Sequence, residues 1–256
     1  MKTTGRIPIQ TLALLLAGVA PAAATSPGAA HPGADCRAAI LEAASPEPGR
    51  VRPAWAGSGM PDAVWRLVDR ASVEEDDDLM RCLLNAAEQL AGRAVEASPE
   101  DADRRYALAV VVGLRADREG GRARVQAASR LHEELRRILE LAPGHAPARH
   151  LLGRLHAGVL RMDGVTRWVA THLLGGGVLG EATWEEAEEN LAFAEAELPD
   201  VPDHHYELAN LYGDTGREAL AVAELEHVLA LEPVSAMEVA VRVKAERLLQ
   251  ELSPGR

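Results

Sequence analysis

The sequence predicts an all-α fold of antiparallel helical hairpins, on the basis of three observations. From Asp62 onward, apolar residues recur at the three- and four-residue spacing of helices, with few signals for β-strands. Proline cannot continue a helix, and Pro99, Pro143, Pro199 and Pro233 each follow a helical stretch. The chain is 47% hydrophobic but only 3% aromatic, so its core is built mainly from Ala, Leu and Val, which suits closely packed helices.

The first 24 residues predict a signal peptide. Lys2 and Arg6 precede a short apolar stretch at 12–20, and Ala22–Ala24 offers the small residues of a cleavage site. The stretch is too short to span a bilayer comfortably, so we expect cleavage of residues 1–24 and export to the periplasm or the outside of the cell. An uncleaved membrane anchor is the alternative.

Net charge limits the class of partner. The whole chain carries −12, and without Lys2 and Arg6 it has 25 basic against 39 acidic residues, a net charge of −14. Such a chain repels phosphate backbones, so we expect no nucleic-acid partner. The charge favours solubility, and its simplest explanation is an acidic solvated surface, with a basic partner as the alternative.

Residues 25–61 predict a linker with a short helix. The Pro- and Gly-containing segment 25–34 is typical of a flexible connection, Asp35–Ala44 has helical character, and Ser45–Pro61 contains four prolines and three glycines. Cys36 lies in this region and Cys82 in the first predicted hairpin. In an exported protein the two could form a disulfide, and two unpaired thiols are the alternative that the sequence leaves open.

The last hairpin carries a repeat pattern. Pro199 and Pro233 lie 34 residues apart. Between them, large and small residues occupy fixed positions of a 34-residue unit, namely His205, Leu208, Ala209, Tyr212, Gly216, Ala221, Leu225 and Val228. This pattern resembles the tetratricopeptide (TPR) repeat, with His205 at a position where Trp is usual. The resemblance implies a right-handed superhelix of stacked hairpins, in which the small residues let paired helices approach closely.

Earlier segments repeat this register over residues 62–252. The first helices of the units open at Trp65–Asp69, Arg105–Ala109, Arg149–Gly153 and His205–Ala209, with Asp69 where a small residue belongs. The second helices are expected at Leu83–Glu96, Val125–Leu141, Trp184–Leu198 and Glu218–Leu231. The first three units are longer than the TPR period, by about 6, 10 and 22 residues.

A terminal helix is predicted at Met237–Leu252. Its residues Val239, Val243 and Leu249 are expected to cover the last hairpin, with Glu238 facing outward.

The third unit resembles a particular family. It carries Leu151–Arg154, an insert with Trp168, the step Leu173–Gly175 and the segment Ala182–Ala187. These features, within residues 62–252, resemble the TPR-like proteins named regulators of microtubule dynamics. Because the motifs are structural, the resemblance implies the fold, and we carry over no activity from it.

Two candidate binding regions follow. In TPR arrays the first helices of the hairpins line a concave groove that takes a peptide or extended segment. By register His150, Arg154, Tyr206 and Asn210 face this groove, and the resemblance places Asn210 where peptide-clamping TPRs carry Asn. An ordinary solvated surface is the alternative.

The insert at 163–180 is the second region. Trp168, Val169 and Leu173 fall on one apolar helix face, which predicts either an internal cap over the array or an exposed docking patch.

We expect no enzymatic activity, cofactor or metal site. The sequence contains neither a Gly-x-Ser-x-Gly nucleophile motif nor a phosphate-binding glycine loop, and its nine histidines follow no metal-binding motif. The sequence therefore predicts an interaction scaffold that binds a protein or peptide. The alternative is an accessory component of a periplasmic transport system that holds a small ligand or a partner binding protein.

Overall fold

A computed structural model describes residues 32–45, 51–57, 59–174 and 176–253. Across these ranges the chain is helical and contains no strand, which confirms the all-α prediction. The predicted signal peptide and most of segment 25–34 lie outside the described residues. The helices are α1 (Pro32–Ala44), α2 (Asp62–Ser72), α3 (Asp77–Ala97), α4 (Ala102–Ala116), α5 (Gly121–Leu141), α6 (Ala146–Leu160), α7 (Gly164–His172), α8 (Trp184–Glu197), α9 (Pro202–Asp214), α10 (Glu218–Ala230) and α11 (Ala236–Leu252), with short 3-10 helices η1 (Ala54–Ala56) and η2 (Gly177–Glu181).

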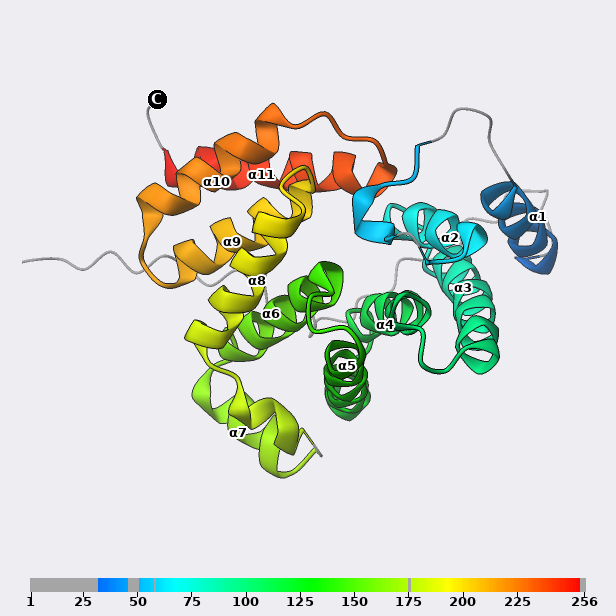
Figure 1. Ribbon diagram of the computed structural model, residues 1–256, viewed down its shortest axis with the longest axis horizontal. Helices are drawn as coiled ribbons and strands as arrows, with labels where there is room; N and C mark the ends of the chain where they lie inside the picture. Colours follow the sequence, from blue (N-terminus) through cyan, green and yellow to red (C-terminus); the bar gives the residue numbers. More distant parts are fainter. Residues whose placement is uncertain (1–31, 46–50, 58, 175, 254–256) are drawn as a thin grey trace, which may run out of the picture. The chain divides into compact units, whose positions relative to one another are not determined.

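Helices pack in pairs, as expected for TPR-like hairpins. The pairs are α2 with α3, α4 with α5, α6 with α8, and α9 with α10 (Figure 1). Ala209 and Ala221, the small residues of the last pair, are both fully buried, so α9 and α10 approach closely. Among the described residues, none of the helices combines the length and apolar character needed to cross a bilayer.

Local sequence explains where the helices begin. The side chains of Asp76, Asp101 and Thr183 each accept a hydrogen bond from a backbone N–H in the first turn of α3, α4 and α8. Such caps satisfy amide groups that have no partner within the helix. At α6 and α9, proline occupies the first turn, where its missing N–H costs nothing.

The residues by which the first three units exceed the TPR length lie in different places in the first two units and in the third. In the first two units they lengthen the second helix, because α3 and α5 each contain 21 residues. In the third they form α7 and η2 between α6 and α8. The short helix predicted at Asp35–Ala44 begins three residues earlier, at Pro32.

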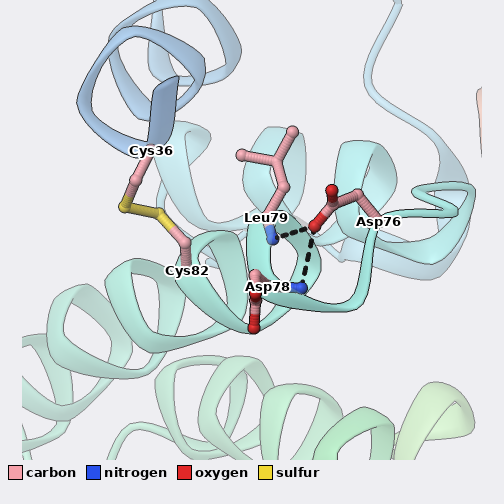
Figure 2. Close-up of a disulfide and its surroundings, with 5 residues drawn as sticks. All are labelled: Cys36, Asp76, Asp78, Leu79 and Cys82. Carbon is pink, nitrogen blue, oxygen red and sulfur yellow. Dashed lines mark hydrogen bonds between the residues drawn. A yellow bond between two sulfur atoms is a disulfide. The ribbon is translucent and has the colours of Figure 1, made fainter. Parts of the chain in front are cut away.

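The disulfide partners come from α1 and α3. Cys36 and Cys82 are bonded, with their Cα atoms 5.9 Å apart (Figure 2). The same figure shows the carboxylate of Asp76 accepting hydrogen bonds from the backbone N–H groups of Asp78 and Leu79 at the start of α3. The covalent bond therefore holds α1 against a well-capped helix of the first hairpin.

The terminal helix α11 is rotated relative to the prediction. Val239 and Val243 are exposed, whereas Val241 and Ala245 are buried against the last hairpin and Glu238 is also buried. The carboxylate of Glu238 accepts from the N–H of Val234, 2.7 Å away. In return, the Glu238 N–H donates to the side-chain oxygen of Ser235 at 3.2 Å. The two bonds form a reciprocal cap at the start of α11, which explains why Glu238 faces inward.

α11 also reaches back to the first hairpin. The buried carboxylate of Asp69 on α2 accepts from the N–H groups of Ala236 and Met237, at 3.3 and 2.9 Å. Figure 1 shows the start of α11 close to α2. At the position of Asp69, a TPR repeat normally has a small residue. Here the position holds an aspartate, which caps a helix that lies more than 160 residues later in the chain.

Candidate functional site

The predicted groove contains a chain of charged contacts between α6 and α9. His150 Nε2 lies 3.0 Å from a carboxylate oxygen of Asp203, and its ring packs on that of His204 with 4.6 Å between ring centres. His150 and His204 are both buried. His150, which the register places on the groove side of α6, is therefore buried in the contact between α6 and α9.

Arg154 continues this chain of contacts. Its guanidinium lies 3.3 Å from Glu207, 3.8 Å from Asp203 and 3.6 Å from Asp117 at the end of α4. Burial by itself would lower the pKa of Arg154, but these three carboxylates raise it above its usual value. Arg154 is thus a cation whose charge is already balanced within the protein, with 39% of its side chain exposed.

Arg161 caps the C-terminal end of α6, about two helical turns after Arg154. It lies 3.9 Å from Glu207 and 2.6 Å from Asp214. Contacts of this kind link all members of a set that we name the ladder, namely His150, Arg154, Arg161, Asp117, Asp203, Glu207 and Asp214. It contains two arginines and four carboxylates. Burial would raise the pKa of Asp203, but His150 and Arg154 hold it well below its usual range, so Asp203 stays ionised. The ladder consequently has an excess of negative charge.

Tyr206 and Asn210 lie one turn apart on α9. The Asn210 side-chain amide donates to the backbone carbonyl of Tyr206 at 2.8 Å, and both residues are half-buried. Burial raises the pKa of Tyr206, whose ring packs against the core of the last hairpin. Asn210 thus bonds to its own helix, although the sequence placed it in a peptide clamp.

A solvent-open hollow lies at the starts of α4 and α6, and its lining residues Ala146 and Pro147 come about one turn before His150 of the ladder. It has a volume of about 540 Å³. Charged and apolar residues share its lining, which consists of Arg52, Pro53, Ala54, Gly57, Asp103, Gly144, His145, Ala146, Pro147, Glu197 and Leu198. Sequence reasoning missed the hollow because one wall comes from the segment 51–57, which was predicted to be linker.

His145 and Asp103 shape this hollow. The ring accepts a hydrogen bond from the Ala148 N–H at Nδ1, so its other nitrogen, Nε2, carries the proton that points to Asp103 Oδ1, 3.1 Å away. Both ring nitrogens are therefore used, one of them to cap α6. The pair fixes the wall of the hollow, and His145 could accept a proton from a substrate only by giving up its cap.

The insert presents an apolar pair of side chains. Trp168 is 53% exposed and Leu173 is 61% exposed, whereas Val169 is half-buried. The indole stacks on His172, with 5.2 Å between ring centres. The helix α7 itself packs on η2 (Figure 1). This contact leaves both members of the pair exposed, as a docking patch requires.

These features define the class of the protein as a TPR-like helical repeat protein, a fold that generally serves as a non-catalytic scaffold. Residues 58–253 match the model of the family described as regulator of microtubule dynamics protein 1-3. The chain belongs to this family.

Comparison with solved structures and curated proteins gives two further findings. A thermophilic TPR protein of Thermus thermophilus is similar at 20% identity and a TM-score of 0.46, over 73% of this chain and 89% of that one. No curated protein matches the chain.

Proposed function

We propose that the protein is an exported, non-enzymatic scaffold that binds a basic segment of a partner protein across the ladder and the adjacent hollow. The acidic excess of the ladder carries this proposal, because complementary charge selects partners and accelerates their association. Asp117 has 64% of its side chain exposed, and Glu197 is exposed in the hollow. A cationic segment could pair with these carboxylates while the buried part of the ladder stays intact.

Export has independent support. The disulfide between Cys36 and Cys82 is of a kind that persists in oxidising compartments and is rare in the cytosol. It agrees with the signal peptide that the sequence predicts. Secretion to the periplasm or beyond is tested by fractionation of cells that express the full chain, combined with N-terminal sequencing of the product. Retention in the cytosol with an intact N-terminus would contradict this part of the proposal.

The shape of the hollow favours a scaffold over a carrier of small ligands. A carrier typically encloses most of its ligand in an apolar pocket. Here the space opens to solvent, and Arg52, Asp103, His145 and Glu197 contribute charged or polar groups to its lining. A peptide crossing an open surface fits this lining better than an enclosed small molecule does.

The test of partner binding uses exposed carboxylates, because Arg154→Ala would leave Asp203 and Glu207 without their counter-charge and would confuse binding with unfolding. We expect Glu197→Lys/Asp117→Lys to weaken binding of Lys- and Arg-rich peptides by about tenfold or more. Binding is measured by fluorescence anisotropy with a panel of basic and acidic peptides, and by recovery of partners from the exported fraction.

The matched control is Glu96→Lys/Glu140→Lys, which makes the same change in net charge on exposed residues outside the lining of the hollow. It should bind basic peptides nearly as well as the wild type. If both double variants bound basic peptides equally weakly, the effect would come from overall charge and not from the ladder and the hollow. A preference of the wild type for acidic peptides would refute the proposed partner chemistry.

A separate observation supports a second docking surface, the exposed pair Trp168 and Leu173. Large aromatic side chains often anchor protein interfaces. Trp168→Ala should reduce partner recovery with little effect on stability, because the indole lies mostly in solvent. Undiminished recovery would assign binding to the ladder and hollow alone.

A further inference from the structure

A cluster of possible metal ligands lies on the last hairpin. Its α9 member, His205, is two residues from Asp203 and Glu207 of the ladder, which places it on the other side of that helix. His205 comes from α9, and Glu224 and His227 come from α10. One ligand atom of each residue lies within 4.8 Å of the others. Because Glu224 and His227 are three positions apart, they lie on the same face of α10, which packs against α9.

The two ring nitrogens of His205 have contacts that suit metal binding by one of them. Its Nε2 lies 2.8 Å from the carbonyl oxygen of Pro199, and its Nδ1 lies 2.7 Å from the Glu224 carboxylate. Both partners are acceptors, so Nδ1 and the carboxylate oxygen must share either a proton or a metal ion. The carbonyl supplies the kind of second contact that orients metal-binding histidines and leaves the other nitrogen for the metal.

We propose that His205, Glu224 and His227 form a binding site for one divalent transition-metal ion of the Zn²⁺ class. Two imidazoles and one carboxylate are a donor set that proteins use for zinc. A tetrahedral ion separates its ligand atoms by about 3.3 Å, so Glu224 Oε2 must move by only a fraction of an ångström from its position beside His205. The ion takes the place of the proton between Nδ1 and the carboxylate, and that proton is released to solvent.

The burial of the ligands gives the site a closed side and an open side. His205 is buried, Glu224 is half-buried and His227 is exposed. The ring of His227 lies 5.1 Å from that of His205, measured between centres. Three protein ligands leave a fourth position for water or for a residue of a partner. His205 also stands where TPR repeats usually carry Trp, so this departure from the repeat coincides with a set of possible metal ligands.

The test measures metal binding directly. The full chain, purified without a polyhistidine tag and stripped with a chelator, is titrated with Co²⁺, and its visible absorption bands are recorded. Zn²⁺ is then added in competition. We expect one equivalent of Co²⁺ with the absorption of a tetrahedral site, displaced by one equivalent of Zn²⁺.

Two variants locate the site. His227→Ala removes an exposed ligand and should leave the core unchanged, while Glu224→Gln keeps the shape of the side chain. Each should weaken Zn²⁺ binding by at least about tenfold. The control, His172→Ala, removes another exposed histidine from α7 and should bind as the wild type does. Circular dichroism and the urea midpoint check that the variants are folded.

The proposal is overturned by either of two results. One is the absence of stoichiometric Co²⁺ and Zn²⁺ binding to the wild type. The other is unchanged affinity in folded His227→Ala, which would mean that any bound metal sits elsewhere.

Discussion

At the scale of single residues, Asp69 shows how one side chain can serve a contact between distant parts of the chain. It is fully buried, and its carboxylate receives two backbone N–H groups from the first turn of α11. A helix start also favours negative charge because of the helix dipole. The repeat register identified Asp69 as an exception but gave no reason for it, because its partners lie on another helix.

We expect Asp69→Ala to lower the free energy of unfolding by roughly 2 kcal/mol, since it leaves two part-buried N–H donors without a charged acceptor. Amide hydrogen exchange in the first turn of α11 should accelerate. Asp76→Ala is the control, because Asp76 also accepts from two N–H groups but is exposed and caps its own helix. It should cost about 1 kcal/mol and leave exchange in α11 unchanged. Unaltered exchange in Asp69→Ala would contradict the capping role.

At the scale of elements, the closeness of α6 and α8 depends on Gly153. A Cβ atom at this position would lie 2.8 Å from the backbone oxygen of Ala187 and 2.8 Å from Leu191 Cγ. The pattern of the sequence predicted a small residue at this register position. The structure adds that even a methyl group is too large, because the obstacle is backbone that cannot turn away.

Gly153→Ala should therefore destabilise the protein by about 1–3 kcal/mol, despite the better helix propensity of Ala. Gly158→Ala, on the same helix with no atom within 4 Å of the added Cβ, should stabilise it by roughly 0.5–1 kcal/mol. Urea unfolding of both variants measures the difference. Equal effects of the two substitutions would mean that the α6–α8 contact is not tight at Gly153.

At the scale of the whole molecule, buried histidines make stability depend on pH. The pKa of His204 is lowered to about 3, mainly by burial. The nearby His150 also lowers this pKa, and the negative charge of Asp203 partly offsets the decrease. Burial also lowers the pKa values of His132 and His156. The unfolded chain, where such groups titrate near pH 6.5, then binds more protons in acid than the folded chain does.

Stability should accordingly fall from about pH 6.5 to about pH 4.5, by roughly 1 kcal/mol per pH unit for each such histidine that is fully neutral in the folded state. Glu238 and His205 oppose this trend, because both have a raised pKa in the folded chain, which therefore takes up their protons before the unfolded chain does. Burial raises the pKa of Glu238, and the hydrogen bonds to Glu224 and Pro199 outweigh burial at His205. Urea unfolding across this range measures the slope. His204→Asn should flatten it, and an unchanged slope in a folded variant would assign the effect to other groups.

The sequence by itself determined the helices, their pairing into hairpins and the small residues Ala209 and Ala221 at the seam, because these depend on spacing and caps within short segments. Tertiary structure decided what the remaining side chains do. Arg154 became a neutralised cation, Glu238 turned inward, and Asp69 capped a distant helix. Each outcome depends on contacts between charged groups and backbone amides of helices that are far apart in the chain. The spacing of residues within one helix gives no information about such contacts.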